Sequence, residues 1–267
     1  MVGGFLGASR DRYGVLVSSS PVGTVPTFST IFNFRDVGGC ATRDGRTVRR
    51  GRLYRSDSLH RIDGTDRETF AALGIRTVID LRRHAEVVQL GRVPHYDGLI
   101  YRHIPVEHRD WSEIPYDEQL GLARYLADRY LELTETGAAD IGETIGVIAD
   151  EAAAPAVVHC VAGKDRTGVV CALTLSVLGV EDSVIAEDYA RSTAASERLS
   201  AWLRTQNPEA ALPPPKPYYS SPADAMHLFL AGLRQRHGSV ERYLLDVGLS
   251  PDQLAALRTH LLQDVAG

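Results

Sequence analysis

This sequence is poor in cysteine, and its few cysteines exclude several classes of protein. Only three occur in 267 residues, at Cys40, Cys160 and Cys171. An odd and widely spread set does not form the framework of a disulfide-rich secreted domain. Because no C-x-x-C pair is present, zinc-ribbon and dithiol redox sites are not expected. The nine histidines also lack the spacing of metal ligands, and we predict neither a metal nor a cofactor.

The chain also lacks a long apolar run and an excess of positive charge. No stretch approaches the ~20 apolar residues that cross a bilayer, and residues 1–20 lack the basic start and apolar centre of a signal peptide. A net charge of −5 disfavours broad binding to nucleic acids or anionic membranes. We therefore expect no nucleic-acid partner, no stable membrane insertion and a cytoplasmic location, although non-classical secretion would leave no signal in the sequence.

What is present is an alternation of short apolar strands and helical stretches, which is typical of an α/β fold. The β-branched run at 77–81 and the apolar run at 156–158 predict buried strands, and residues 46–54 and 99–105 are further candidates. Helical spacing and capping signals predict helices at 65–73, 116–134, 140–152, 167–178, 182–191, 194–205 and 223–237, and a last one opened by Ser250-Pro251.

No clean domain boundary is visible along the chain. Residues 1–30, rich in Gly, Ser, Thr and Pro, predict an N-terminal extension, and residues 31–267 predict a single domain. Two segments of this domain, about 112–136 and 194–222, are candidates for helical lids. The second ends in a proline-rich stretch of the kind that often forms a lid or a flexible loop.

The chemistry concentrates in one ten-residue loop between the strand at 156–158 and the next helix. It reads His159-Cys160-Val161-Ala162-Gly163-Lys164-Asp165-Arg166-Thr167-Gly168. A strand, a glycine-containing loop and a helix N-terminus direct backbone N–H groups and a helix dipole at an anion. The same field favours the thiolate form of a cysteine at the start of the loop. An arginine six residues later has the reach to bind two phosphate oxygens.

Each residue of this loop then has an expected role. Cys160 attacks phosphorus to form a phosphocysteine, which water hydrolyses. Arg166 clamps the phosphate, Thr167 hydrogen-bonds the Cys160 sulfur, and His159 orients the start of the loop. The predicted phosphate-binding residues are Val161, Ala162, Gly163, Lys164, Arg166 and Thr167.

Two other kinds of site share parts of this pattern. A nucleotide-binding P-loop needs Gly-x4-Gly-Lys-Ser/Thr, but Val158 stands at the first glycine position and Asp165 follows Lys164. A rhodanese-like sulfur carrier also places a cysteine between a strand and a helix. The run Lys164-Asp165-Arg166-Thr167 favours phosphate instead.

The loop and three further segments resemble the tyrosine-phosphatase-like family of the mycobacterial PtpB type. The segments are Asn33-Phe34-Arg35-Asp36-Val37-Gly38-Gly39, Gly51-Arg52-Leu53-Tyr54-Arg55-Ser56-Asp57, and Gly74-Ile75-Arg76-Thr77-Val78-Ile79-Asp80-Leu81-Arg82 with Glu86. The resemblance covers roughly residues 33–191. It implies a cysteine-phosphatase-type fold, with a central, mainly parallel sheet flanked by helices, and activity on phosphotyrosine, often with phosphoserine, phosphothreonine or phosphoinositides. In this family a lysine at the position of Lys164 accompanies acceptance of phosphoinositides.

The general acid remains open. Asp165, inside the loop, is the first candidate. In the family an aspartate follows the strand that corresponds to residues 103–106, but here that stretch continues as Glu107-His108-Arg109-Asp110. His108 lies nearest the expected position, so Asp110 and Glu107 are the alternatives.

Other charged residues near the predicted strands have a functional and a structural interpretation. Asp80, Arg82 and Glu86 form either a catalytic set or an ion-pair set that stabilises the end of a central strand. Arg35 and Asp36 either support the phosphate loop or close a turn. The supporting residues that we predict are His159, Asp36, Asp80 and Arg82.

The two remaining cysteines are expected to take no part in the reaction. Cys171 falls on an apolar helical stretch and is predicted to be inert core. Cys40 follows two glycines and is predicted to lie in a loop. A redox partnership between Cys40 and Cys160 is the alternative.

Three functions fit this sequence. The first is a protein tyrosine or dual-specificity phosphatase that also acts on phosphoinositides, with a phosphorylated protein as its partner. The second is a phosphatase for a small phosphorylated metabolite, such as a nucleotide or sugar phosphate, because substrate choice depends on the elements around the loop. The third is a non-catalytic module that binds phosphate groups.

Overall fold

A five-stranded sheet forms the centre of the computed structural model, which describes residues 26–109, 111, 114–206 and 219–265. The strand order is β1-β3-β6-β4-β5. The strands are β1 (Arg35–Asp36), β3 (Leu53–Ser56), β6 (Ala156–His159), β4 (Thr77–Asp80) and β5 (Ile100–His103). Only β1 runs antiparallel to its neighbour, and the other pairs are parallel. The predicted α/β fold with a mainly parallel sheet is confirmed.

The strand predicted at 46–54 is divided in two. Thr47–Val48 forms β2, which pairs with β7 (Leu262–Gln263) in a separate small sheet, and β3 begins only at Leu53. Between β2 and β3, Gly51 takes a φ of +71°, a conformation that breaks an extended run. The prediction of one continuous strand was therefore wrong.

Side chains on the central strands alternate between two hydrophobic cores, because successive residues of a strand face opposite sides of the sheet. The larger core contains Leu53, Ile79 and Val158, and the smaller one contains their neighbours Tyr54, Val78 and Val157. Both faces of the sheet are therefore covered. This explains why β4 and β6 read as short continuous apolar runs rather than as alternating ones.

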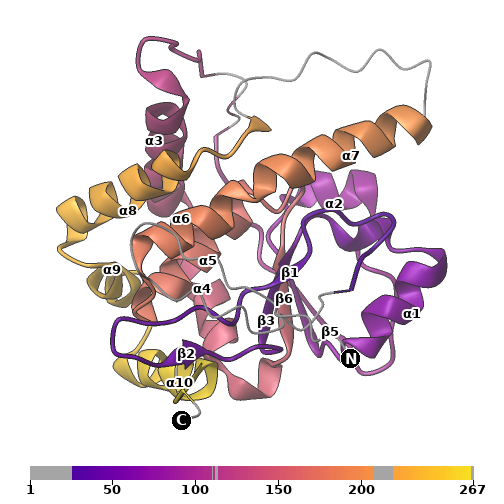
Figure 1. The fold of residues 1–267 in the computed structure, drawn as a ribbon, viewed down its shortest axis with the longest axis horizontal. Coiled ribbons are helices and arrows are strands. Elements are labelled where there is room, and N and C mark those ends of the chain that lie inside the picture. The colour runs from indigo at the N-terminus through magenta and orange to yellow at the C-terminus, as the bar shows by residue number, and fades with distance from the viewer. Residues whose placement is uncertain (1–25, 110, 112–113, 207–218, 266–267) are drawn as a thin grey trace, which may run out of the picture.

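Helices cover the two faces unequally (Figure 1). On the smaller core lie η1 (Leu59–Arg61) and α1 (Gly64–Ala72). Helix α2 (His84–Leu90) follows β4 and contributes no buried residue. The larger core packs against α3 (Gly121–Thr136), α4 (Ala138–Ala149), η3 (Glu151–Ala153), α5 (Asp165–Val177), α6 (Asp182–Ala190), α8 (Ala223–His237), α9 (Val240–Asp246) and α10 (Pro251–Leu261). After α6, α7 (Ser192–Gln206) runs across the end of the sheet. The helices that were predicted appear within a few residues of their expected ends, but α2 was not predicted.

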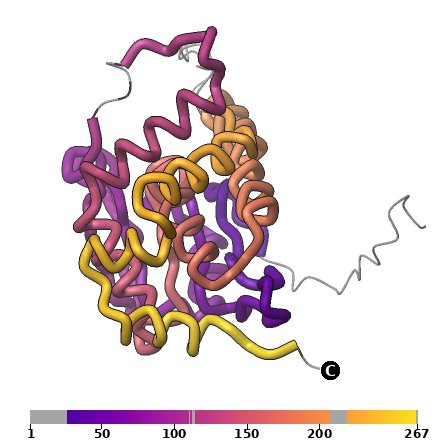
Figure 2. Tube along the Cα trace, turned by 90° about the vertical axis from the view of Figure 1, so that its left-hand side faces the viewer, coloured from indigo at the N-terminus to yellow at the C-terminus, as the bar shows by residue number. Residues whose placement is uncertain are grey.

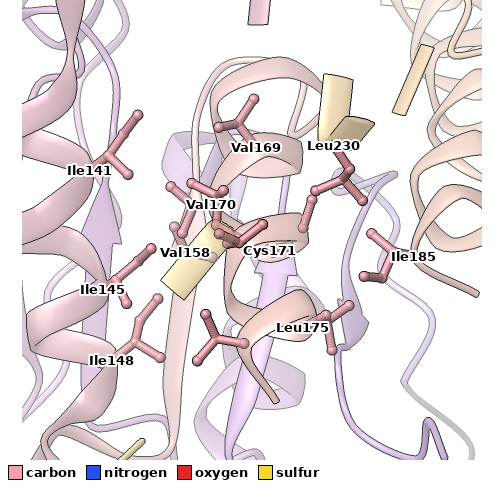
Figure 3. Close-up of a cluster of buried hydrophobic side chains, with 14 of the residues drawn as sticks. Ile141, Ile145, Ile148, Val158, Val169, Val170, Cys171, Leu175, Ile185 and Leu230 are labelled. Atoms are coloured by element: carbon pink, nitrogen blue, oxygen red, sulfur yellow. The ribbon is translucent and has the colours of Figure 1, made fainter. Parts of the chain in front are cut away.

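Helix α5, which follows the phosphate loop, runs through the middle of the larger core. Figure 3 shows Ile141, Ile145 and Ile148 of α4 on one side of it, and Ile185 of α6 and Leu230 of α8 on the other. The position of the loop is therefore fixed by buried contacts on several sides.

The two predicted lid segments are only partly described. In the first, α3 packs along α8, as Figure 2 shows from that side. In the second, α7 is described to Gln206, and residues 207–218 lie outside the described part of the chain. Whether either segment acts as a lid stays a prediction. At the other end of the domain, Ser29 and Thr30 hydrogen-bond with Asp66 of α1, so the last residues of the predicted extension pack on the domain.

The described residues contain no candidate for a membrane span and none for a metal site. No helix among them combines the length and the apolar character needed to span a bilayer. Within the same ranges, no group of three or more His, Cys, Asp and Glu side chains has the arrangement of a metal site.

Candidate active site

The loop from Cys160 to Lys164 connects β6 to α5, and β6 lies between β3 and β4. Its backbone turns sharply at Gly163, which has a φ of +65°. A Cβ atom at this position would stand 2.3 Å from the carbonyl oxygen of Ser56. Only glycine fits here, because both the conformation and the close approach exclude a side chain.

Three carbonyl groups of the loop are bonded to the surrounding protein. The bonds run from Ser58 N to Val161 O (3.0 Å), from Asn33 Nδ2 to Ala162 O (2.9 Å) and from Arg55 Nη2 to Gly163 O (2.7 Å). In the described part of the chain, the N–H groups of Val161, Ala162 and Gly163 form no hydrogen bond. The loop therefore uses its carbonyls for support and keeps these three N–H groups for an anion.

Arg166 is buried and is held by Glu86 of α2. Its Nη1 lies 2.7 Å from Glu86 Oε2 and its Nη2 3.1 Å from Oε1, and Nη1 also donates to Leu81 O at 3.2 Å. Nε forms no hydrogen bond to any described residue, so the guanidinium keeps a donor for a ligand. Burial alone would lower the pKa of Arg166, but the charges of Cys160 and Glu86 raise it above its ordinary value.

Cys160 is buried at the start of the loop, with 2% of its surface exposed. Its charge contributes to the raised pKa values of both Arg166 and Arg55, so the Cys160 sulfur lies near two guanidinium groups. The Cys160 carbonyl accepts a hydrogen bond from Nδ1 of His159 at 3.1 Å, which fits the predicted role of His159 at the start of the loop.

Arg55 belongs to a buried ionic cluster behind the loop. Its Nη1 lies 2.6 Å from Oδ2 of Asp188 on α6, and Arg35 Nε lies 2.6 Å from Oδ1 of the same carboxylate. Burial opposes the charge of Asp188, but Arg55 and Arg35 lower its pKa well below the ordinary value. Arg35 also donates to Asn33 Oδ1. Asp188 therefore holds the two side chains, those of Arg55 and Asn33, that bind loop carbonyls, the second of them through Arg35.

Asp36 does not support the loop, and this part of the prediction is wrong. Its two carboxylate oxygens accept hydrogen bonds from Gly38 N (2.7 Å) and Gly51 N (2.8 Å). These bonds close a turn next to β1. The supporting role belongs to Asn33, three residues earlier in the same motif.

Asp80 and Arg82 form a fully buried pair at the end of β4. Arg82 Nη2 lies 2.6 Å from Asp80 Oδ2, which also accepts from the Tyr101 hydroxyl at 2.8 Å. Burial alone would raise the pKa of Asp80, but His159 and Arg82 lower it to about 2. His159 Nε2 stands 3.6 Å from the same carboxylate. Within the predicted set, Asp80 therefore pairs with Arg82, whereas Glu86 pairs with Arg166.

Asp165 is the first residue of α5 and makes two contacts through one oxygen. Its Oδ1 accepts from the Tyr130 hydroxyl at 2.7 Å and lies 3.3 Å from Lys164 Nζ. Burial and the charge of Arg166 lower the pKa of His108, and the charge of Asp165 opposes them. The His108 side chain therefore faces the loop. The alternative acid Glu107 is exposed and lies near Asp140 of α4, whose pKa it affects after burial and Glu143. The other alternative, Asp110, lies outside the described residues.

Two other loop residues differ from their expected positions. Lys164 was predicted at the mouth of the pocket, but it is 3% exposed, and its Nζ donates to Ser220 O at 3.2 Å. The Thr167 hydroxyl is buried and forms no hydrogen bond with any described residue. The predicted bond from Thr167 to the Cys160 sulfur is therefore not formed.

The other two thiols lie away from this chemistry. Cys171 is part of the larger core (Figure 3), and burial raises its pKa to about 11. Cys40 is half-buried beside Asp188, Arg50 and Asp36, and burial raises its pKa as well. All three cysteines are free thiols.

Sequence reasoning missed the residues that hold the loop. Asn33 and Arg55 both stand in the motifs that carry the family resemblance, so a signal existed for them. No local pattern distinguished Asp188 from other residues of amphipathic helices.

Comparisons with known proteins identify sequences and structures to which this chain is similar. A model of the tyrosine phosphatase family matches residues 26–263. The chain is 30% identical to the triple specificity protein phosphatase PtpB of Mycobacterium tuberculosis, over 86% of this chain and 96% of that protein. It is 28% identical to a tyrosine-protein phosphatase of Nostoc commune, over 76% and 71%. Among solved structures, the core catalytic domain of the PP-IP phosphatase SIW14 from S. cerevisiae aligns with a TM-score of 0.36 and 13% identity, over 79% of this chain and 94% of that one.

Proposed function

The chain belongs to the tyrosine phosphatase family and is a phosphoric monoester hydrolase, and from this premise we propose that Cys160, Arg166 and Asp165 carry out its reaction. The observation that carries the assignment is the loop itself. Its carbonyls are bonded outward, its three N–H groups remain for an anion, and a buried cysteine and arginine stand at its two ends.

In the first step the Cys160 thiolate attacks phosphorus and a sulfur–phosphorus bond forms. The bond between phosphorus and the leaving oxygen breaks, and Asp165 donates a proton to that oxygen. The amides of the loop and the guanidinium of Arg166 bind the transferring oxygens throughout. Because these donors are held in place before substrate arrives, they stabilise the transition state without a cost of reorganisation.

In the second step water attacks the phosphocysteine. Asp165, now a carboxylate, accepts a proton from this water, and the thiolate of Cys160 leaves as phosphate is released. The cycle regenerates both groups and requires no redox change. A thiolate nucleophile of this kind needs reducing conditions, which supports a cytoplasmic location for the protein.

We further propose that the substrates are phosphorylated proteins, with phosphotyrosine as the preferred group and phosphoinositides as additional substrates. The relatives named as tyrosine-protein and triple specificity protein phosphatases support this choice. The domain at 31–267, preceded by a short extension, would supply the whole site.

Turnover of an aryl phosphate by Cys160→Ser tests the mechanism. We expect the variant to lose all measurable activity while it keeps the circular dichroism and melting temperature of the native protein. Native activity should be unchanged by EDTA. Activity retained by Cys160→Ser would overturn the mechanism, and a panel of phosphopeptides, phosphoinositides and phosphorylated metabolites, compared by kcat/KM, would test the substrate class.

A further inference from the structure

Two buried tyrosines stand behind Asp165, and the steps above give them no role. Tyr130 lies on α3 and Tyr189 on α6, and their exposed fractions are 0% and 1%. The Tyr130 hydroxyl is 2.7 Å from Asp165 Oδ1 and 2.6 Å from the Tyr189 hydroxyl. The two rings meet edge to face, with centroids 5.9 Å apart.

The direction of the hydrogen bonds in this chain follows from its chemistry. Burial, and then the charge of Asp165, raise the pKa values of Tyr130 and Tyr189 above that of a free tyrosine, so both keep their protons. A carboxylate only accepts hydrogen bonds. Tyr130 must therefore donate its one proton to Asp165, and Tyr189 must donate to the Tyr130 oxygen. Each bond in such a chain polarises and strengthens the next.

The contacts of Asp165 all fall on one oxygen. Oδ1 accepts from Tyr130 and faces Lys164 Nζ at 3.3 Å. Oδ2 accepts no hydrogen bond from any residue in the described ranges. The carboxyl group is thus oriented, with one oxygen anchored to the protein and the other left for a reacting group.

We propose that Tyr130, supported by Tyr189, is a positioning residue that anchors Oδ1 of Asp165, so that Oδ2 gives and takes the proton in both steps. This inference rests on the assignment of Asp165 as general acid. In the first step the bond between Oδ2 and its proton breaks as the leaving oxygen gains that proton. In the second step Oδ2 takes a proton from the attacking water.

Tyr130 itself transfers no proton in this scheme. The carbonyl oxygen of a carboxylic acid and the oxygen of a carboxylate both accept a hydrogen bond. The bond from Tyr130 to Oδ1 therefore persists in both protonation states of Asp165. The carboxyl group need not rotate between the two steps, and this keeps Oδ2 aligned with the phosphorus centre.

The opposing interpretation is that the two tyrosines only fill the core. The Tyr130 ring also packs against Phe229, at a centroid distance of 6.0 Å, and phenylalanine would preserve that packing. Tyr243 provides a matched control. It is equally buried, and its hydroxyl donates at 2.9 Å to the Thr134 carbonyl on the same helix α3, but it has no contact with Asp165.

The test compares kcat/KM for aryl phosphates with good and poor leaving groups, since only a poor leaving group needs the acid. For Tyr130→Phe we expect a fall on the order of tenfold with the poor leaving group and less than about twofold with the good one. Tyr189→Phe should show a smaller fall of the same pattern. Tyr243→Phe should leave both values unchanged.

A double mutant separates this inference from the function on which it rests. If Tyr130 acts through Asp165, then Tyr130→Phe has no further effect in an Asp165→Asn background. A loss that persists in that background, or one that is equal for good and poor leaving groups, overturns the positioning role while the general acid stands. If Asp165→Asn lowers kcat/KM equally for good and poor leaving groups, the assignment of Asp165 as the acid is overturned.

Discussion

Two buried arginines beside Cys160 are held in opposite ways. Arg55 is fixed by Asp188, a carboxylate on a helix in the larger core that also binds Arg35. Arg166 is fixed by Glu86. Glu86 lies on α2, and no residue of that helix is buried. Arg55 donates hydrogen bonds to two groups of the protein itself, the Asp188 carboxylate and the Gly163 carbonyl. The arginine that supports the loop is thus tied to the core, and the arginine proposed to bind substrate is tied to a peripheral helix.

The largest effect among the residues of this comparison should come from Arg166→Lys, which removes the planar donor set and keeps the charge. A lysine cannot bind two phosphate oxygens and Glu86 together, and we expect kcat/KM to fall on the order of 10⁴-fold. The free energy of unfolding should fall by less than for Asp188→Asn, because lysine keeps the charge that pairs with Glu86. Steady-state kinetics and urea unfolding check the two halves. Activity within tenfold of the native protein would show that charge alone suffices.

Asp188→Asn should have the opposite profile, with a large loss of stability. The substitution leaves two buried guanidinium groups, those of Arg35 and Arg55, without a counter-charge. We expect the free energy of unfolding to fall by about 3 to 5 kcal/mol. Asp182→Asn is a matched control on the same helix, because Asp182 pairs with Arg234 at 2.5 Å but both side chains are partly exposed. The control should cost less than about 1 kcal/mol, and equal losses in urea unfolding would contradict the comparison.

Glu86→Gln should reduce activity with a smaller loss of stability than Asp188→Asn. Glutamine preserves the hydrogen bond that Glu86 accepts from Arg83 N at the start of α2, so the substitution removes only the charge that holds Arg166. A misplaced guanidinium should lower kcat/KM on the order of tenfold to a hundredfold. The loss of stability should stay below that of Asp188→Asn, because Glu86 pairs with one guanidinium whereas Asp188 pairs with two. A variant that loses stability but keeps full activity would mean that the pair with Arg166 is structural.

The sequence predicted the loop because everything needed to recognise it is local. Ten consecutive residues between a strand and a helix determine the conformation, the nucleophile and the arginine. The contacts that hold the loop are not local, since Asn33 and Ala162 are 129 residues apart and Arg55 and Gly163 are 108 apart. No periodicity in the chain pairs such residues. Asp36 was therefore predicted to support the loop, although the supporting hydrogen bond comes from Asn33.

The fold was predictable to the same extent and for the same reason. Strands and helices with a buried face carry an apolar pattern, and α8 at Ala223–His237 was found at its predicted ends. Helix α2 has no buried residue, so it has no apolar face from which to predict it. The strand β1 is two residues long, too short for any pattern. The elements that escaped prediction include the one that carries Glu86.

The smallest effect is expected at acid pH. As the pH falls, the stability contributed by the ionised carboxylate of Glu86 should be lost before that of Asp188. Burial would raise the pKa of Glu86, but Arg166 lowers it below the ordinary value, and the pKa of Asp188 is lowered much further. A carboxyl group with a lowered pKa contributes its full stability above the ordinary value, about 4, and loses it as the pH falls through the folded-state pKa. The difference in unfolding free energy between native protein and Glu86→Gln should therefore vanish at a higher pH than the difference for Asp188→Asn. Urea unfolding between pH 7 and about 3 should show the Glu86 difference shrink while most of the Asp188 difference is retained, and loss of the Asp188 difference first would reverse the order of the two pairs.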